Sequence, residues 1–248
     1  MGRSGAHSAR TMMFDEVNAL LQSLPDFTTR SEYYQQIIEC NLLAKRTQKT
    51  RQLTFRHLND LYGLDPGLPL FRMFRKLWAL DEEARPLLAL SMALARDPLL
   101  RLSEDFIMAK PVGSSVTSEE MLAVIEQKQP GRFSAASLKS FAQNINSTWT
   151  QAGFLAGKTK KIRHRPKIMP VNSVFCVFLG YLEGLSGQRL FSTRWANLLG
   201  CPADELTALL TSAANSGLLV FLNAGGIVEV RFPGFLSAEE EKWIHEQD

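Results

Sequence analysis

The feature that most constrains the fold of this chain is a repeated passage from an amphipathic helix, through a glycine, into a short segment typical of a β-hairpin. It occurs at Gly153 and again at Gly217, 64 residues later. A glycine just after the last helical residue often adopts the left-handed conformation that ends a helix. The second passage continues into two β-prone runs joined by Asn223-Ala224-Gly225-Gly226, which predicts a hairpin. We therefore expect β-structure only near 154–168 and 218–232.

The rest of the chain has the apolar spacing of helices, and a length of 248 residues suggests about two domains. The predicted fold class is mainly α, with an N-terminal helical bundle followed by two winged-helix-like units with short β-hairpins. The linker Lys110–Ser115 separates the bundle from these units. The predicted segments are a disordered start (1–13), a helical domain (14–110), a winged-helix-like unit with a basic wing (116–168), a C-terminal winged-helix unit (170–236) and an acidic tail (237–248).

Candidate caps set the expected helix limits within the bundle. Ser31 is a candidate N-cap for a helix that runs to about Lys45, and Thr47 or Thr50 begins the next one. Asp81 is expected to cap the fifth helix. Helical spacing then continues from 99 to 108.

Composition indicates a soluble protein with an uneven charge distribution. The formal net charge is +3, yet residues 237–248 hold five acids against one lysine, so the remaining chain carries +7. No apolar stretch approaches the roughly 20 residues of a spanning helix, and the start has no signal-peptide pattern, so we expect a cytoplasmic protein without membrane contact. Cys40, Cys176 and Cys201 lie far apart and form no C-x-x-C pair; we expect free thiols, with Cys40 and Cys176 buried.

The segment Lys158–Lys167 is the strongest candidate binding site. Six of its ten residues are Lys or Arg and none is acidic, and it follows a helix whose polar side carries no charge except Lys139. A solvated charged loop is the alternative, but such crowding is relieved when a polyanion binds. Phosphate contacts position a protein on DNA without specifying sequence. The predicted DNA-binding residues are Arg132, Lys139, Gln143, Asn144, Ser147, Lys158, Lys160, Lys161, Arg163, His164, Arg165 and Lys167.

Two other regions are weaker candidates. The bundle holds a second basic group, which an ordinary solvated helix face explains equally well: Lys45, Arg46, Lys49, Arg51 and Arg56. In the C-terminal unit, Asp204 and Glu205 occupy the first turn of the helix that would lie in a DNA groove. Acids there complement the helix dipole but repel phosphate. We expect that unit to be structural or to contact proteins.

No catalytic, metal-binding or cofactor-binding pattern is present. The four histidines have no metal-ligand spacing, and His7 lies in the predicted disordered start. Phosphate-loop, dinucleotide-binding and nucleophile-elbow motifs are absent. We therefore expect no enzyme activity, no cofactor and no metal site.

Several segments resemble the BrxA family, small components of bacterial BREX phage-defence systems. They are Glu39–Leu43 with Arg46-Thr47 and Arg51, the run 87–100 with Asp105-Phe106, the exit Gly153-Phe154-Leu155, and the stretch from Ala213-Ala214 to Phe221. The resemblance covers most of residues 31–232. It implies a cytoplasmic, non-enzymatic, mostly helical protein that binds double-stranded DNA and acts beside other defence proteins. The start 2–13 and the tail after Phe235 depart from the family pattern.

The sequence leaves three alternatives to a DNA-binding accessory protein. The basic surface would equally serve a scaffold that binds an acidic protein partner. An ordinary winged-helix transcription regulator is a second alternative, although no effector pocket or dimerisation helix is evident. RNA in place of DNA is a third, because a basic patch alone does not distinguish them.

Overall fold

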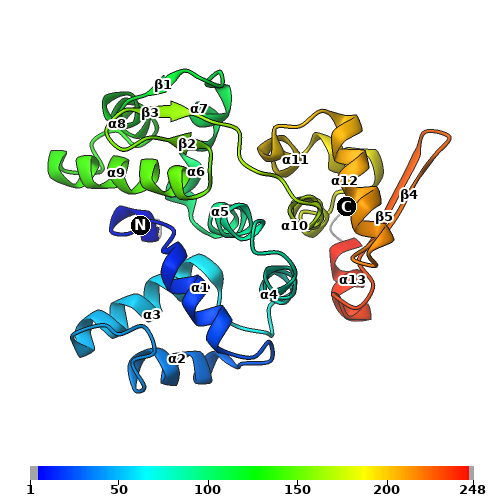
Figure 1. Ribbon diagram of the computed structural model, residues 1–248, viewed down its shortest axis with the longest axis horizontal. Helices are drawn as coiled ribbons and strands as arrows, with labels where there is room; N and C mark the ends of the chain where they lie inside the picture. Colours follow the sequence, from blue (N-terminus) through cyan, green and yellow to red (C-terminus); the bar gives the residue numbers. More distant parts are fainter. Residues whose placement is uncertain (1–4, 246–248) are drawn as a thin grey trace.

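The computed structural model describes residues 5–245 and is mainly α, as expected (Figure 1). The first region is helical throughout. Helices α4 and α6 begin at Pro69 and Pro98, where the missing N–H leaves no donor unpaired. The elements of this region are η1 (Ala6–Ser8), α1 (Phe14–Ser23), α2 (Arg30–Ile38), α3 (Gln48–Tyr62), α4 (Pro69–Leu80), α5 (Arg85–Arg96), α6 (Pro98–Arg101) and α7 (Glu104–Ala109).

The middle unit combines two helices with a small antiparallel sheet in the order β1-β3-β2. Its elements are β1 (Ser115–Val116), α8 (Ser118–Lys128), α9 (Ala135–Gln151), β2 (Leu155–Ala156) and β3 (Lys161–Arg163). The hairpin expected near 154–168 is thus confirmed. Strand β1, which pairs Ser115 with Ile162, lies at the end of the predicted linker and was not expected. A two-residue strand has no periodicity by which a sequence could reveal it.

The C-terminal unit repeats the sequence of helices followed by a hairpin. Its elements are α10 (Pro170–Leu182), η2 (Gly187–Ser192), α11 (Arg194–Leu199), α12 (Ala203–Asn215), β4 (Val220–Ala224) and β5 (Ile227–Arg231). The predicted hairpin is confirmed, with Val220 opposite Arg231. Gly153 and Gly217 have φ of 82° and 72°, so both helix exits use the left-handed conformation predicted for them.

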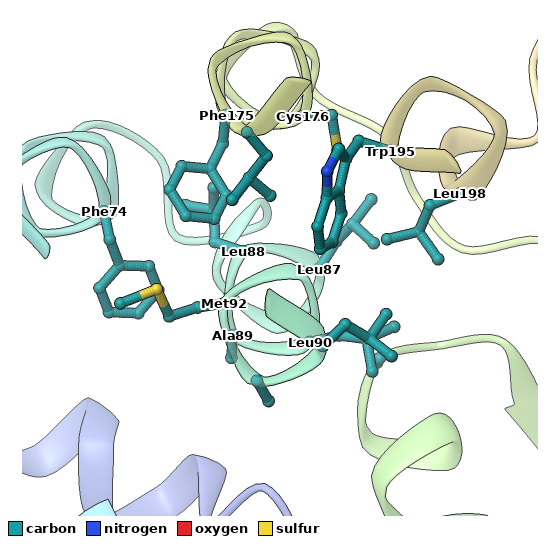
Figure 2. Close-up of a cluster of buried hydrophobic side chains, with 14 of the residues drawn as sticks. Phe74, Leu87, Leu88, Ala89, Leu90, Met92, Phe175, Cys176, Trp195 and Leu198 are labelled. Atoms are coloured by element: carbon teal, nitrogen blue, oxygen red, sulfur yellow. The ribbon is translucent and has the colours of Figure 1, made fainter. Parts of the chain in front are cut away.

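Helix α5 lies at the centre of the protein. Every side chain from Leu87 to Leu94 is at most 1% exposed, which requires neighbours on all sides of the helix. Figure 2 shows Phe74 of α4 on one side of α5, and Phe175 of α10 and Trp195 of α11 on others. The rings of Phe74 and Phe175 are 5.9 Å apart. The bundle and the C-terminal unit therefore share one continuous core.

The start of the chain differs from the expectation of disorder. Residues 1–4 lie outside the described residues, but residues 5–13 are packed against the rest of the protein. His7 and Met12 are fully buried, and the Tyr62 hydroxyl donates a hydrogen bond to the Met12 carbonyl at 2.5 Å. The sequence offered no sign of this, because the partners are far along the chain.

Three helix limits and one cysteine also differ from the predictions. Helix α2 is capped by Thr29 rather than Ser31, through a capping box with Glu32, and it ends at Ile38. Helix α5 begins at Arg85, because the Asp81 carboxylate accepts the Glu83 N–H within a preceding turn. The predicted helix from 99 to 108 is split into α6 and α7. Cys40 is exposed, whereas Cys176 is buried as expected.

Residues 237–245 of the predicted acidic tail form a helical segment that packs on the bundle, and residues 246–248 lie outside the described residues. Helix α13 (Ala238–His245) buries Ile244, and its Glu240 carboxylate accepts the N–H of Ser237 at 2.8 Å. The Arg72 guanidinium on α4 donates to the same carboxylate at 2.6 Å. Part of the tail charge is therefore neutralised within the protein.

Every helix among residues 5–245 is too short or too polar to cross a bilayer.

Candidate nucleic-acid interface

The basic segment 158–167 divides into a free tip and an anchored base. The tip is the turn between β2 and β3, and its shape depends on Gly157, which has φ of 99°. A Cβ atom at this position would lie 2.2 Å from the Lys160 carbonyl oxygen, so only glycine permits the turn.

Three lysines lie at the tip or directly beside it: Lys158 and Lys160 in the turn, and Lys161 as the first residue of β3. Lys158 and Lys160 are exposed and form no hydrogen bond or ion pair with residues 5–245. Lys161 is half-buried, and its ammonium group donates to the Gly157 carbonyl at 2.7 Å. None of the three faces a carboxylate within 4 Å in the described part of the chain. These residues therefore present three positive charges that no acid in the described part of the chain compensates, and we call them the wing lysines.

Arg163 is a structural residue, which corrects its assignment to the DNA-binding set. Its side chain is 6% exposed, and its guanidinium donates to the carbonyls of Ile107, at 3.0 Å, and of Phe154 and His164. The guanidinium also lies 5.0 Å from the centre of the Phe154 ring. Burial lowers the pKa of Arg163 below its ordinary value. The side chain fastens β3 to α7 and is not available to phosphate.

The remaining charges of the segment face other parts of the protein. Arg165 donates to the Gly200 carbonyl at 2.8 Å and lies 3.6 Å from the Glu205 carboxylate. The Lys167 ammonium is 2.5 Å from Glu83. The His164 ring is exposed and has no hydrogen bond in the described structure. Arg165 and Lys167 thus already contact acids, although both pairs are at the surface, where ion pairs are weak.

Helix α9 packs against β2 of the hairpin and carries no acidic residue of its own, although the neighbouring helix α8 has the exposed acids Glu119 and Glu126. Ser134 caps α9. Lys139 and Gln143 are exposed, and Ser147 is half-buried. Spacings of four residues place these three side chains on one face of the helix.

Two other predicted DNA-binding residues, Arg132 and Asn144, differ in whether they contact the rest of the protein. Arg132 precedes α9, is exposed, and donates to the Gln129 side chain at 2.7 Å. The Asn144 amide instead donates to the His7 carbonyl at 3.1 Å and holds the N-terminal segment. Asn144 therefore has a structural contact, and its assignment as a DNA-binding residue stays a prediction.

His7, which the sequence predicts to be disordered, is fully buried and hydrogen-bonded. Its Nδ1 lies 2.8 Å from Asp97 Oδ2, and its Nε2 lies 3.0 Å from the Thr148 hydroxyl of α9. That hydroxyl also accepts the Met12 N–H at 2.9 Å. Burial acts to raise the pKa of Asp97, but the hydrogen bonds from His7 and the Leu99 N–H outweigh it and lower this pKa.

This arrangement resembles a catalytic triad in its distances only. His7, Asp97 and Thr148 are each at most 2% exposed, so no substrate could reach the hydroxyl. The three residues instead join the start of the chain, the α5–α6 junction and α9. We call them the N-terminal clamp.

The second basic group of the bundle is only partly a surface. Lys45 pairs with Glu16 at 2.9 Å, and Arg51 donates to the Ile38 carbonyl at the end of α2. These two side chains are therefore engaged within the protein, and their part in a second basic surface stays a prediction. Arg46, Lys49 and Arg56 are exposed and unpaired within residues 5–245.

The two C-terminal arginines that would lie nearest DNA both have acid partners among residues 5–245. Arg194 pairs with the buried Glu104 of α7 at 2.5 Å, and Arg231 pairs with Glu229 at 2.8 Å. Asp204 and Glu205 are exposed in the first turn of α12. This surface is less suited to phosphate than that of the middle unit.

Within residues 5–245, no three His, Cys, Asp or Glu side chains lie together as a metal site would require. A scan against protein-family models and a search of curated proteins found no match for the chain.

Proposed function

We propose that this protein is a non-enzymatic accessory protein that binds double-stranded DNA in a bacterial, BREX-type phage-defence system. The observation that carries the DNA-binding part is the free, acid-free tip of the β2–β3 hairpin beside α9. The wing lysines pair with no acid among residues 5–245, and helix α9, which packs against β2 of the same hairpin, has no carboxylate. The resemblance of residues 31–232 to BrxA supports the defence role and other defence proteins as partners.

The order of elements in the middle unit supports a winged-helix interpretation. A helix, a strand, two helices and a hairpin follow one another from α7 to β3, and α9 is the helix that would enter the major groove. Lys139, Gln143 and Ser147 would then face the bases. The wing lysines and Arg132 would contact phosphates, which position a protein without specifying sequence.

The salt dependence of binding tests this proposal. Four phosphate contacts, from Arg132 and the wing lysines, would give log affinity a slope of about −3.6 against log salt concentration. Fluorescence anisotropy with duplex DNA, single-stranded DNA and RNA at several salt concentrations would measure it. Equal, weak and salt-independent binding to all three would contradict the proposal.

A second candidate function, protein docking, is favoured by the outer face of the β4–β5 hairpin. Leu222 and Ile227 are 53% and 74% exposed, although both belong to strands where apolar side chains usually face a core. These two residues could meet an apolar surface on another defence protein. Replacing both with Ser should abolish co-purification with such a partner and leave DNA affinity unchanged.

A further inference from the structure

A polar cavity of about 690 Å³ lies between η1, the end of α3 and the α5–α6 junction. Its walls include Asp60, Arg96, Asp97 and Arg101. Cavities that bind small molecules are usually of this size. The cavity is separate from the wing lysines, since none of them lines it.

Two guanidinium groups in the wall are fixed in position by backbone carbonyls. Arg96 donates through Nε to the Asp60 carbonyl at 3.0 Å and through Nη2 to the Asn59 carbonyl at 3.3 Å. Arg101 donates through Nη1 to the carbonyls of Ala95, at 3.0 Å, and Leu94. A guanidinium has five N–H donors, so each group keeps donors for a ligand. Holding them in advance lowers the entropy cost of binding.

Neither guanidinium has a counter-ion in the described part of the chain. No carboxylate there lies within ion-pair distance of Arg96 or Arg101, although both are half-buried. Asp97 is a buried acid in the wall, and its carboxylate is occupied by the N–H and the ring of His7 and by the Leu99 N–H. Burial lowers the pKa of Arg96, while Asp60 acts in the opposite direction. A partly buried, unpaired charge is costly unless an anion meets it.

We propose that this cavity binds a small phosphate-bearing molecule through Arg96 and Arg101. The planar fork of a guanidinium matches two phosphate oxygens at once. Asp60 is exposed at the edge of the cavity and can accept hydrogen bonds from hydroxyl or amino groups. This favours a phosphate ester with such groups, as in a mononucleotide, over inorganic phosphate alone.

Calorimetric titration of the full chain with AMP, ATP, pyrophosphate and adenosine tests the proposal. The three phosphate compounds should bind and raise the melting temperature, because a ligand of the folded state stabilises it. Adenosine should do neither. Arg101→Gln should weaken AMP binding about tenfold or more, since hydrogen bonds to charged groups contribute at least that much. The matched control is Arg30→Gln, an exposed arginine that does not line the cavity.

Three outcomes would overturn the proposal. They are adenosine binding as tightly as AMP, no response to any phosphate compound at millimolar concentration, and unchanged AMP affinity in Arg101→Gln. If that variant fails to fold, the difference in affinity between AMP and adenosine for the parent protein tests whether the cavity recognises phosphate. Alanine replacement of the wing lysines should leave AMP binding unchanged. Displacement of AMP by a short DNA duplex would instead assign the cavity to a backbone phosphate of DNA.

Discussion

The two hairpin-bearing units have similar backbones and opposite electrostatics. In each, a helix ends at a glycine with positive φ, Gly153 or Gly217, and a hairpin follows. In the middle unit the hairpin carries lysines that pair with no acid among residues 5–245, whereas in the C-terminal unit the hairpin arginine pairs with Glu229 on the face that also exposes Leu222 and Ile227. The likeness of backbone therefore says little about what each unit binds. The charges and apolar groups on the hairpin decide it.

Two arginines occupy equivalent positions in the two hairpins, and replacing them should give the largest difference in unfolding free energy. Arg163 is opposite Leu155, and Arg231 is opposite Val220, in each case the first residue of the preceding strand. Arg163→Ala should cost about 3 kcal/mol of unfolding free energy, because it leaves buried carbonyls without donors. Arg231→Ala should cost less than about 0.5 kcal/mol, because its ion pair is exposed. Urea denaturation measures both; equal costs would show that the two arginines are equivalent.

Alanine replacement of Lys158, Lys160 and Lys161 tests the proposed difference in binding. If each contacts one phosphate, the slope of log affinity against log salt concentration should become shallower by about 2.7. All duplex sequences should be weakened alike. The control is Arg231→Ala on the other hairpin, which should bind as the parent does. Unchanged binding by the triple variant would move the site to the exposed Arg46, Lys49 and Arg56.

Glycine substitutions separate backbone strain from steric overlap. Gly217 has φ of 72° and open space around it, so Gly217→Val should cost about 1 kcal/mol from strain alone. Gly157→Val adds an overlap with the Lys160 carbonyl and should cost more. Thermal melts give both values. A melting temperature for Gly217→Val equal to that of the parent would show that this helix exit tolerates side chains.

Replacing Arg165 should have the smallest effect on stability. It also tests whether the base of the basic segment contacts DNA as the tip is proposed to do. It connects the basic segment to the C-terminal unit through the Gly200 carbonyl and Glu205, with both side chains about half exposed. Arg165→Ala should therefore lower the unfolding free energy by no more than about 1 kcal/mol. If Arg165 only joins the units, the salt slope of DNA binding stays at the parent value. A slope shallower by about 0.9 would return Arg165 to the phosphate-contacting residues.

The sequence predicted the parts of this fold that depend on neighbouring residues. The glycine at each helix exit and the turn of the second hairpin are local features, and both were found where expected. The burial of Arg163 was missed because its partner on α7, the Ile107 carbonyl, lies 56 residues away. His7 was missed for the same reason, since Asp97 is 90 residues away. A histidine among glycines and serines has no local pattern that predicts such a partner.

The N-terminal clamp also bears on the order in which the chain can fold as it is synthesised. His7 is made early, but its partner Thr148 follows 141 residues later. Contacts between such distant positions form slowly, because a long loop must close first. We expect residues 5–13 to wait in an unfolded state at the ribosome until α9 has emerged, and then to dock as one of the last steps. A segment that is synthesised well before α9 would thereby reach its final place only after α9.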